Sequence, residues 1–164
     1  MAYLLDANVF IQAKNLQYGF DFCPAFWDWL VVKHAEGSLF SIQQVGDELR
    51  AGDDELTAWA EARAEGFFLP PDAAVLSVLP RLSSWANSQS FRPAAVSMFL
   101  QGADYWLVAF AAAHGHVVVT HEVASDAVSR IKIPNACIGM NVCFMTPYQM
   151  LRLERARFVL GRAE

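Results

Sequence analysis

The sequence predicts an α/β protein with helices on both faces of a central parallel sheet, a three-layer α/β/α arrangement. Of its 164 residues 55% are hydrophobic and only 18% are charged, which supplies enough apolar surface for one core. Short apolar runs typical of buried strands alternate with longer segments of helical periodicity. We therefore expect a single domain over residues 1–164, with right-handed crossovers between its strands.

The first third of the chain contains two strand–helix units. Residues 3–6 form an apolar run of strand type, and residues 8–16 can form a helix with one apolar face. A proline opens the amphipathic segment 24–36, which a glycine ends. Residues 38–42 then predict a second strand, followed by a short helix in residues 43–52.

The middle of the chain has the weakest strand pattern. Residues 54–65 predict a helix with acidic residues in its first turn, and residues 67–70 are the next strand candidate. The stretch that follows has helical pieces, which we expect to break at Pro80 and again at NSQSFRP. We interpret residues 67–101 as a helical insertion.

The last third repeats the alternation. Residues 102–115 predict a helix and residues 116–120 a strand. The polar and basic segment 121–132 is expected to be a turn or short helix, and residues 141–146 are expected to be the last strand. The sequence TPYQ has the form of a capping box, which opens a final helix over residues 147–158.

Composition limits the classes of function. The net charge of −5 gives no global attraction to nucleic acid, so a phosphate-bearing substrate must be attracted locally. The first residues show no pattern of a secretory signal, and Asp104 interrupts the one long apolar stretch, residues 94–113, so we expect neither a secretory signal nor a membrane span. The cysteines form neither a CxxC pair nor an even framework, which favours a reducing cytoplasm; they are Cys23, Cys137 and Cys143.

Four acidic residues fall where a parallel sheet forms its functional crevice, beyond the carboxyl ends of the strands. Asp6 ends the first strand and Glu122 follows the fourth, while Glu48 and Asp104 stand early on helices. Carboxylates brought together repel one another unless a cation lies among them. Mg²⁺ or Mn²⁺ prefers such oxygen ligands, and either ion would serve phosphodiester hydrolysis by activating water and neutralising phosphoryl charge.

In their order, the motifs LLDANVF, VGDEL, GADYWLVAFAAAHG and VVVTHE resemble those of the PIN-domain family. That family carries Asp at the end of its first strand, Glu on the helix after the second, a third acid opening a later helix, and a strand ending in Thr-x-Asp. The likeness covers residues 3 to about 145, with Glu122 where the family usually has Asp, and the added length at 67–101 indicates a divergent branch.

The resemblance implies a PIN-like domain and a metal-dependent ribonuclease, often the toxin of a VapC-type toxin–antitoxin pair. The four acids would then be both catalytic residues and metal ligands: Asp6, Glu48, Asp104 and Glu122.

Each acid also has an alternative. Asp6 could cap the following helix, and Asp104 could complement the dipole of its own helix. Asp47 competes with Glu48, and Asp126 competes with Glu122 for the place of the fourth acid.

The candidate substrate contacts surround these acids. Asn8 could order Asp6 or contact a phosphate, and Thr120 could donate a hydrogen bond to a ligand or to the backbone. His121, Arg130 and Lys132 form a small basic group that could contact RNA phosphates or be ordinary solvated charge.

The sequence therefore predicts a cytoplasmic Mg²⁺- or Mn²⁺-dependent endoribonuclease that acts on single-stranded RNA. A cognate antitoxin is the expected protein partner, and the apolar composition permits a homodimer. One alternative is a PIN-like binding module with weak catalysis. Another is a phosphatase of the haloacid-dehalogenase type, for which Asn8 stands where that family has its second Asp.

Overall fold

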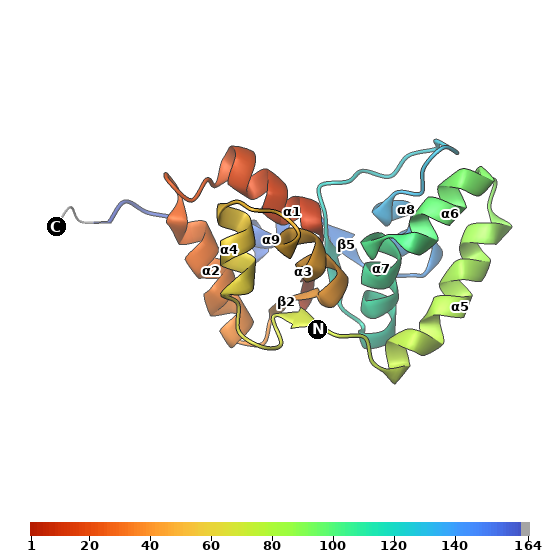
Figure 1. Ribbon diagram of the computed structural model, residues 1–164, viewed down its shortest axis with the longest axis horizontal. Coiled ribbons are helices and arrows are strands. Elements are labelled where there is room, and N and C mark those ends of the chain that lie inside the picture. Colours follow the sequence, from red (N-terminus) through yellow and green to blue (C-terminus); the bar gives the residue numbers. More distant parts are fainter. Residues whose placement is uncertain (162–164) are drawn as a thin grey trace.

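The computed structural model describes residues 1–161 and contains a five-stranded parallel sheet between helices (Figure 1). The strand order is β3-β2-β1-β4-β5. Every strand expected from the sequence is present, and the α/β fold class is confirmed. Their bounds are β1 Tyr3–Leu5, β2 Leu39–Ile42, β3 Phe68–Leu69, β4 Val117–Val119 and β5 Phe144–Met145.

One layer of helices comes mainly from the first half of the chain. α2 packs on β2, and Trp27 of α2 meets Trp59 of α4 edge to face, with ring centroids 5.0 Å apart. α1 runs directly into a π-helical turn, η1. The bounds of these elements are α1 Ala7–Gln12, η1 Ala13–Gln17, α2 Pro24–Ala35, α3 Gln43–Arg50 and α4 Glu55–Glu61.

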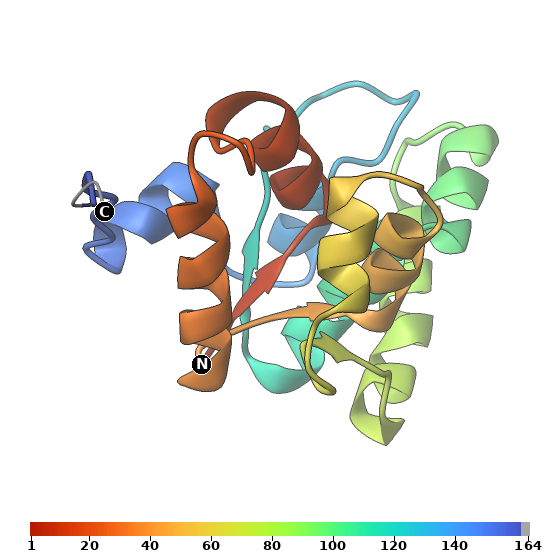
Figure 2. The ribbon, with the colours of Figure 1, turned by 60° about the vertical axis from the view of Figure 1, so that its left-hand side comes forward.

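The other layer is built on α7, which contacts both β2 and β4. α5 and α6 pack against α7 away from the strands, and α8 lies beside it (Figures 1 and 2). The last helix, α9, begins with the expected capping box at Thr146 and Gln149. The bounds are α5 Ala73–Ser88, α6 Pro93–Gln101, α7 Ala103–His114, α8 Ile133–Gly139 and α9 Pro147–Leu153.

The topology creates a switch point between β1 and β4. From β1 the chain moves to β2 on one side, and it later returns to β4 on the other side. Leu5 pairs with Val119, and the backbone N–H of Asp6 donates to the carbonyl oxygen of Val119 at 3.0 Å. Asp6 and Thr120 therefore leave the sheet side by side, where ligands of open α/β sheets bind.

The expected break at Pro80 was wrong, because α5 continues through that residue. The proline removes one helical hydrogen bond, but Val78 and Leu82 on either side of it are buried in the core. Packing of the apolar face against α7 thus holds the helix together where the local rule predicts an interruption.

Three further elements near the C-terminus differ from expectation in extent or type. Residues 121–132 form no helix and run as an extended loop. α8 directly after this loop was not predicted, since its seven residues are too few for a clear periodicity. α9 ends at Leu153, and residues 155–161 are irregular.

Within residues 1–161, no single helix has the length and apolar character needed to cross a membrane. The apolar stretch noted in the sequence forms α6 and α7, which are bent by 69° at the break between them.

Candidate active site

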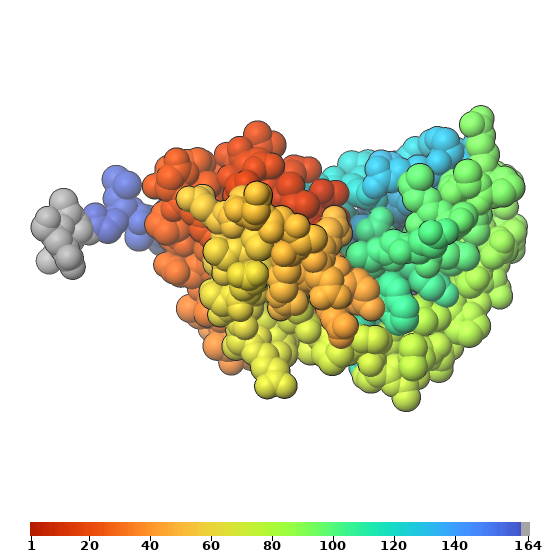
Figure 3. All heavy atoms as spheres, in the orientation of Figure 1, coloured from red at the N-terminus to blue at the C-terminus, as the bar shows by residue number. Residues whose placement is uncertain are grey.

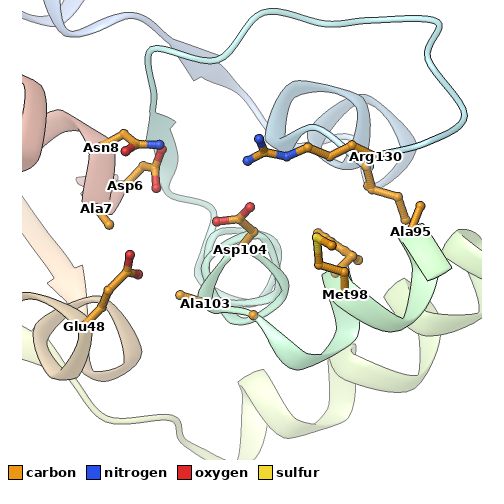
Figure 4. A pocket seen from close by; sticks show the side chains of 12 residues that line it. Asp6, Ala7, Asn8, Glu48, Ala95, Met98, Ala103, Asp104 and Arg130 are labelled. Carbon is orange, nitrogen blue, oxygen red and sulfur yellow. The ribbon is translucent and has the colours of Figure 1, made fainter. Parts of the chain in front are cut away.

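A cavity of about 310 Å³ opens beyond the carboxyl ends of the central strands, at the switch point. Figure 3 shows the surface hollowed between the red and orange N-terminal elements and the green helices. The carboxylates of Asp6, Glu48 and Asp104 point into this space from three separate elements (Figure 4). Asn8 and Arg130 complete the polar part of the lining, and the apolar part includes Ala95, Met98, Phe99 and Ile131.

Asp6 is the most buried of these acids, with only 3% of its surface exposed. The hydroxyl of Thr120 donates to Oδ2 of Asp6 at 3.0 Å. Asp6 is the N-cap residue of α1 but makes no side-chain capping hydrogen bond, so the capping alternative does not explain its burial. Burial, and then the negative charge of Asp104, raise the pKa of Asp6 to about 7, although the Thr120 hydroxyl and then the backbone N–H of Asn8 offset part of the rise.

Asp104 lies in the first turn of α7 and faces Asp6 across the cavity. Burial, followed by the charges of Glu122 and Glu48, raises its pKa to about 6, against the opposing influence of Arg130. A carboxylate that only complemented a helix dipole would have a lowered pKa. The two acids thus meet in one partly dry space without enough positive charge to balance them.

The structure also separates Glu48 from its competitor on α3. Glu48 is exposed and lines the cavity, whereas Asp47 does not line it. Asp47 instead lies 3.8 Å from Arg50, in a surface ion pair one helical turn away. Of the two acids on α3, Glu48 is therefore the one at the cavity, and its role as a metal ligand stays a prediction.

Glu122 lies close to the cavity but is not part of its lining. Its Oε1 accepts a hydrogen bond from Nη2 of Arg130 at 2.9 Å, and its Oε2 accepts one from the backbone N–H of Ile133 at 2.7 Å. Both carboxylate oxygens therefore have partners within the protein. The competing acid, Asp126, is exposed on the loop and does not line the cavity either.

The remaining candidate residues surround the site at different depths. Thr120 is buried, and its hydroxyl links Asp6 to the backbone N–H of Glu122. His121 packs edge to face on Tyr148, and burial lowers the pKa of its imidazole. Lys132 is half-buried outside the cavity lining, close enough that its charge lowers the pKa of Asp104.

The apolar wall from α6 was missed by sequence reasoning. Met98 lines the cavity with 66% of its surface exposed, and Phe99 lies beside it. A solvent-facing methionine next to a buried aromatic residue was a weak signal. It could not be placed at the site because the path of residues 67–101 over the sheet is not readable from periodicity.

The donor set fits a hard divalent cation by its chemistry. Asp6, Glu48 and Asp104 offer only oxygen atoms, and burial together with neighbouring negative charge raises the pKa of both Asp6 and Asp104. Across residues 1–161, however, no three side chains of Asp, Glu, His or Cys lie close enough together to form a ready metal site. The three acids therefore have the oxygen ligands that such an ion prefers, but their side chains are too far apart to coordinate it together as they are placed.

Comparison with known proteins supports the fold. The model of a family described as a domain of unknown function (DUF4411) matches residues 3–158. No curated protein matches the sequence significantly. Two chains in solved structures are similar, one from FitAB bound to an IR36 DNA fragment and one from FitAcB of Neisseria gonorrhoeae. The first is 18% identical with a TM-score of 0.56, covering 89% of this chain and 95% of its own length.

The second is 20% identical with a TM-score of 0.55, covering 89% of this chain and 98% of its own length. At these identities the likeness concerns the fold. The α/β fold expected from the sequence is thus shared with these two chains.

Proposed function

This chain is a member of the DUF4411 family, and we propose that it is a Mg²⁺- or Mn²⁺-dependent endoribonuclease that cleaves single-stranded RNA. One observation carries the proposal: Asp6, Glu48 and Asp104 open into one cavity at the switch point of a parallel sheet. These residues lie far apart in the sequence but close to one another at the cavity, where their negative charges would repel one another without a cation. A site of this kind is suited to stabilise charge on a phosphodiester.

The shape of the cavity supports a single strand as the substrate. Its volume of about 310 Å³ is on the scale of one nucleotide, which suits an unpaired residue of a single strand. Met98 and Phe99 form an apolar wall across from the acids, against which an unstacked base could pack. Substrate specificity would then depend on this wall, while the acids act on the phosphate.

In this proposal Asp6, Glu48 and Asp104 would hold the cation. A bound Mg²⁺ or Mn²⁺ supplies Lewis acidity, which lowers the pKa of water and offsets charge on phosphoryl oxygens. Thr120 orients Asp6 through the bond to Oδ2, and the start of α7 positions Asp104. The cavity lining within residues 1–161 contains no Ser, Cys or His, in keeping with a reaction that needs no side-chain nucleophile.

We further propose that the protein acts in a reducing cytoplasm as the toxin of a toxin–antitoxin pair, with a cognate antitoxin as partner and a homodimer as its assembly. The shared fold with chains of FitAB and FitAcB supports this reading. The domain would comprise residues 1–164, with α5 and α6 as the helical part of the inserted segment 67–101.

One observation favours a second candidate, a PIN-like binding module with weak catalysis. Glu122 stands at the position of the fourth acid, but both of its carboxylate oxygens accept hydrogen bonds from groups inside the protein. A module of this kind would still bind a divalent ion through the other acids but would not cleave RNA.

The test is cleavage of an end-labelled single-stranded RNA by the full chain with Mn²⁺ and with EDTA. We expect Mn²⁺-dependent cleavage that falls at least about 100-fold in Asp6→Asn and in Asp104→Asn. Asp47→Asn, which changes an exposed acid on α3 outside the cavity, is the matched control and should keep wild-type activity. Binding of Mn²⁺ without any cleavage by the wild type would favour the binding module instead.

A further inference from the structure

The loop that carries Arg130 is held in place although it has no regular structure. Residues 121–132 run from β4 to α8 (Figure 1), and Arg130 and Ile131 near the end of this loop line the cavity. The backbone N–H of Ser125 donates to Oδ1 of Asn135 at 3.0 Å, and Nδ2 of Asn135 donates back to the Ser125 carbonyl at 2.9 Å. Farther along, the carbonyl of Val128 accepts from the backbone N–H of Arg92 at 2.9 Å. The loop is therefore tied to α8 and to the start of α6.

Glu122 holds the start of this loop through hydrogen bonds to neighbouring groups. Only 9% of its side chain is exposed, and a carboxylate at that depth must be paired. Its partners are Arg130 and the backbone N–H of Ile133, and its own N–H donates to Thr120 Oγ1 at 3.1 Å. The carboxylate thus points toward the loop and α8 and has no free oxygen for a ligand in the cavity.

Arg130 brings positive charge into a cavity of acids. It is the one basic residue in the cavity lining within residues 1–161, and half of its side chain is exposed. Figure 4 shows its guanidinium extended toward Asn8 and Asp6, above Asp104. An arginine has five N–H donors in a planar fork, and a single hydrogen bond to Glu122 leaves most of them available.

A phosphodiester needs such a group here. The protein has a net charge of −5, and three carboxylates face the cavity, so an RNA strand approaching it is repelled at both long and short range. A guanidinium fork matches two phosphate oxygens and remains charged at any working pH.

We propose that Arg130 binds the phosphate of the RNA strand in this cavity, and that Glu122 is a positioning residue that holds the Arg130 guanidinium, instead of a fourth metal ligand. This inference rests on the proposed nuclease function and assigns separate tasks to its acids. Asp6, Glu48 and Asp104 serve the cation, while Glu122 serves the substrate through Arg130. The Glu in place of the usual Asp has the length to reach both Arg130 and the backbone N–H of Ile133.

The inference predicts a particular pattern in the kinetic constants. Arg130→Ala removes a charged contact to phosphate and should raise KM for RNA about 10- to 100-fold, with Arg130→Lys in between. Glu122→Gln keeps the shape but releases the guanidinium, and should raise KM about 10-fold. Because Glu122 acts through Arg130, adding Glu122→Gln to Arg130→Ala should change KM by less than about 2-fold.

The experiment measures RNA cleavage by the full chain at saturating Mn²⁺ for the wild type, both single variants and the double variant. Mn²⁺ affinity is measured by calorimetry on the same proteins without RNA. Arg92→Ala, an exposed arginine beside the same loop but outside the cavity lining, is the matched control and should keep the wild-type KM. Circular dichroism melting confirms that each variant is folded.

Unchanged Mn²⁺ affinity together with non-additive KM effects supports the inference. A Glu122→Gln protein that binds Mn²⁺ at least about 10-fold more weakly would make Glu122 a metal ligand and overturn it. Wild-type KM in Arg130→Ala, or fully additive effects in the double variant, would also overturn it while leaving the nuclease function intact. If the wild type shows no Mn²⁺-dependent cleavage, the proposed function fails and this inference fails with it.

Discussion

Neutralising Asp6 should stabilise the metal-free protein, even though Asp6 is a buried, hydrogen-bonded residue. Its pKa is about 7 in the folded protein against an ordinary value of 3.8, so the folded state holds the proton more tightly than the unfolded state. The contribution of Asp6 to the free energy of unfolding is therefore most favourable below pH 3.8, declines as the pH rises toward 7, and is constant above that. Relative to acid pH, this shift lowers the free energy of unfolding by about 4 kcal/mol at pH 8, where Asp6 is ionised in both states, and by about 2 kcal/mol at pH 5, where only the unfolded chain is ionised.

The change to test is Asp6→Asn, which keeps the size of the side chain and an acceptor for Thr120. In EDTA at pH 8 the variant should unfold at a temperature higher by on the order of 10 °C, and this advantage should shrink by half or more at pH 5. Thermal melting followed by circular dichroism at both pH values measures the effect. Asp47→Asn, at an exposed position on α3, should change the melting temperature little at either pH.

A variant Asp6→Asn that melts at or below the wild-type temperature at pH 8 would refute the reasoning. It would mean that Asp6 is well compensated in the folded protein and contributes to stability as a charge. The case for a cation between Asp6 and Asp104 would then lose its electrostatic basis.

Two other predictions concern the cation and the packing of the core. Millimolar Mn²⁺ should raise the melting temperature of the wild type at pH 8 by several degrees. The rise should be much smaller in Asp104→Asn, because this variant has lost one ligand. An equal rise in both proteins would place the ion elsewhere. Gly139→Ala should lower the free energy of unfolding, measured in urea, by about 1–3 kcal/mol, since a Cβ there would lie 2.2 Å from the Trp85 ring. The control is Ser88→Ala, at an exposed site on the same helix as Trp85, which should lower it by under about 0.5 kcal/mol.

The sheet was predictable because its signals are local. β1 and β4 are runs of apolar residues that end at a polar residue, and apart from the half-buried Tyr3 their side chains are buried in the fold. The continuation of α5 through Pro80 was not predictable, because it depends on packing against α7, which comes more than twenty residues later.

The site was predictable to a similar degree. Asp6 and Asp104 could be placed because strand ends and helix starts meet at one edge of a parallel sheet. The partners of Glu122 could not, since they depend on how residues 121–132 turn back toward α8. A sequence shows that an acid follows a strand, but the direction of its carboxylate is decided by a loop without periodicity.

The central position of β1 has a consequence for the order in which the molecule is completed during synthesis. β1 leaves the ribosome first, yet Asp6 acquires its neighbours only when Val119 and Thr120 have been added. Arg130 follows ten residues after Thr120. A nascent chain must therefore extend well past its hundredth residue before Asp6 and Thr120 can come together at the head of the cavity.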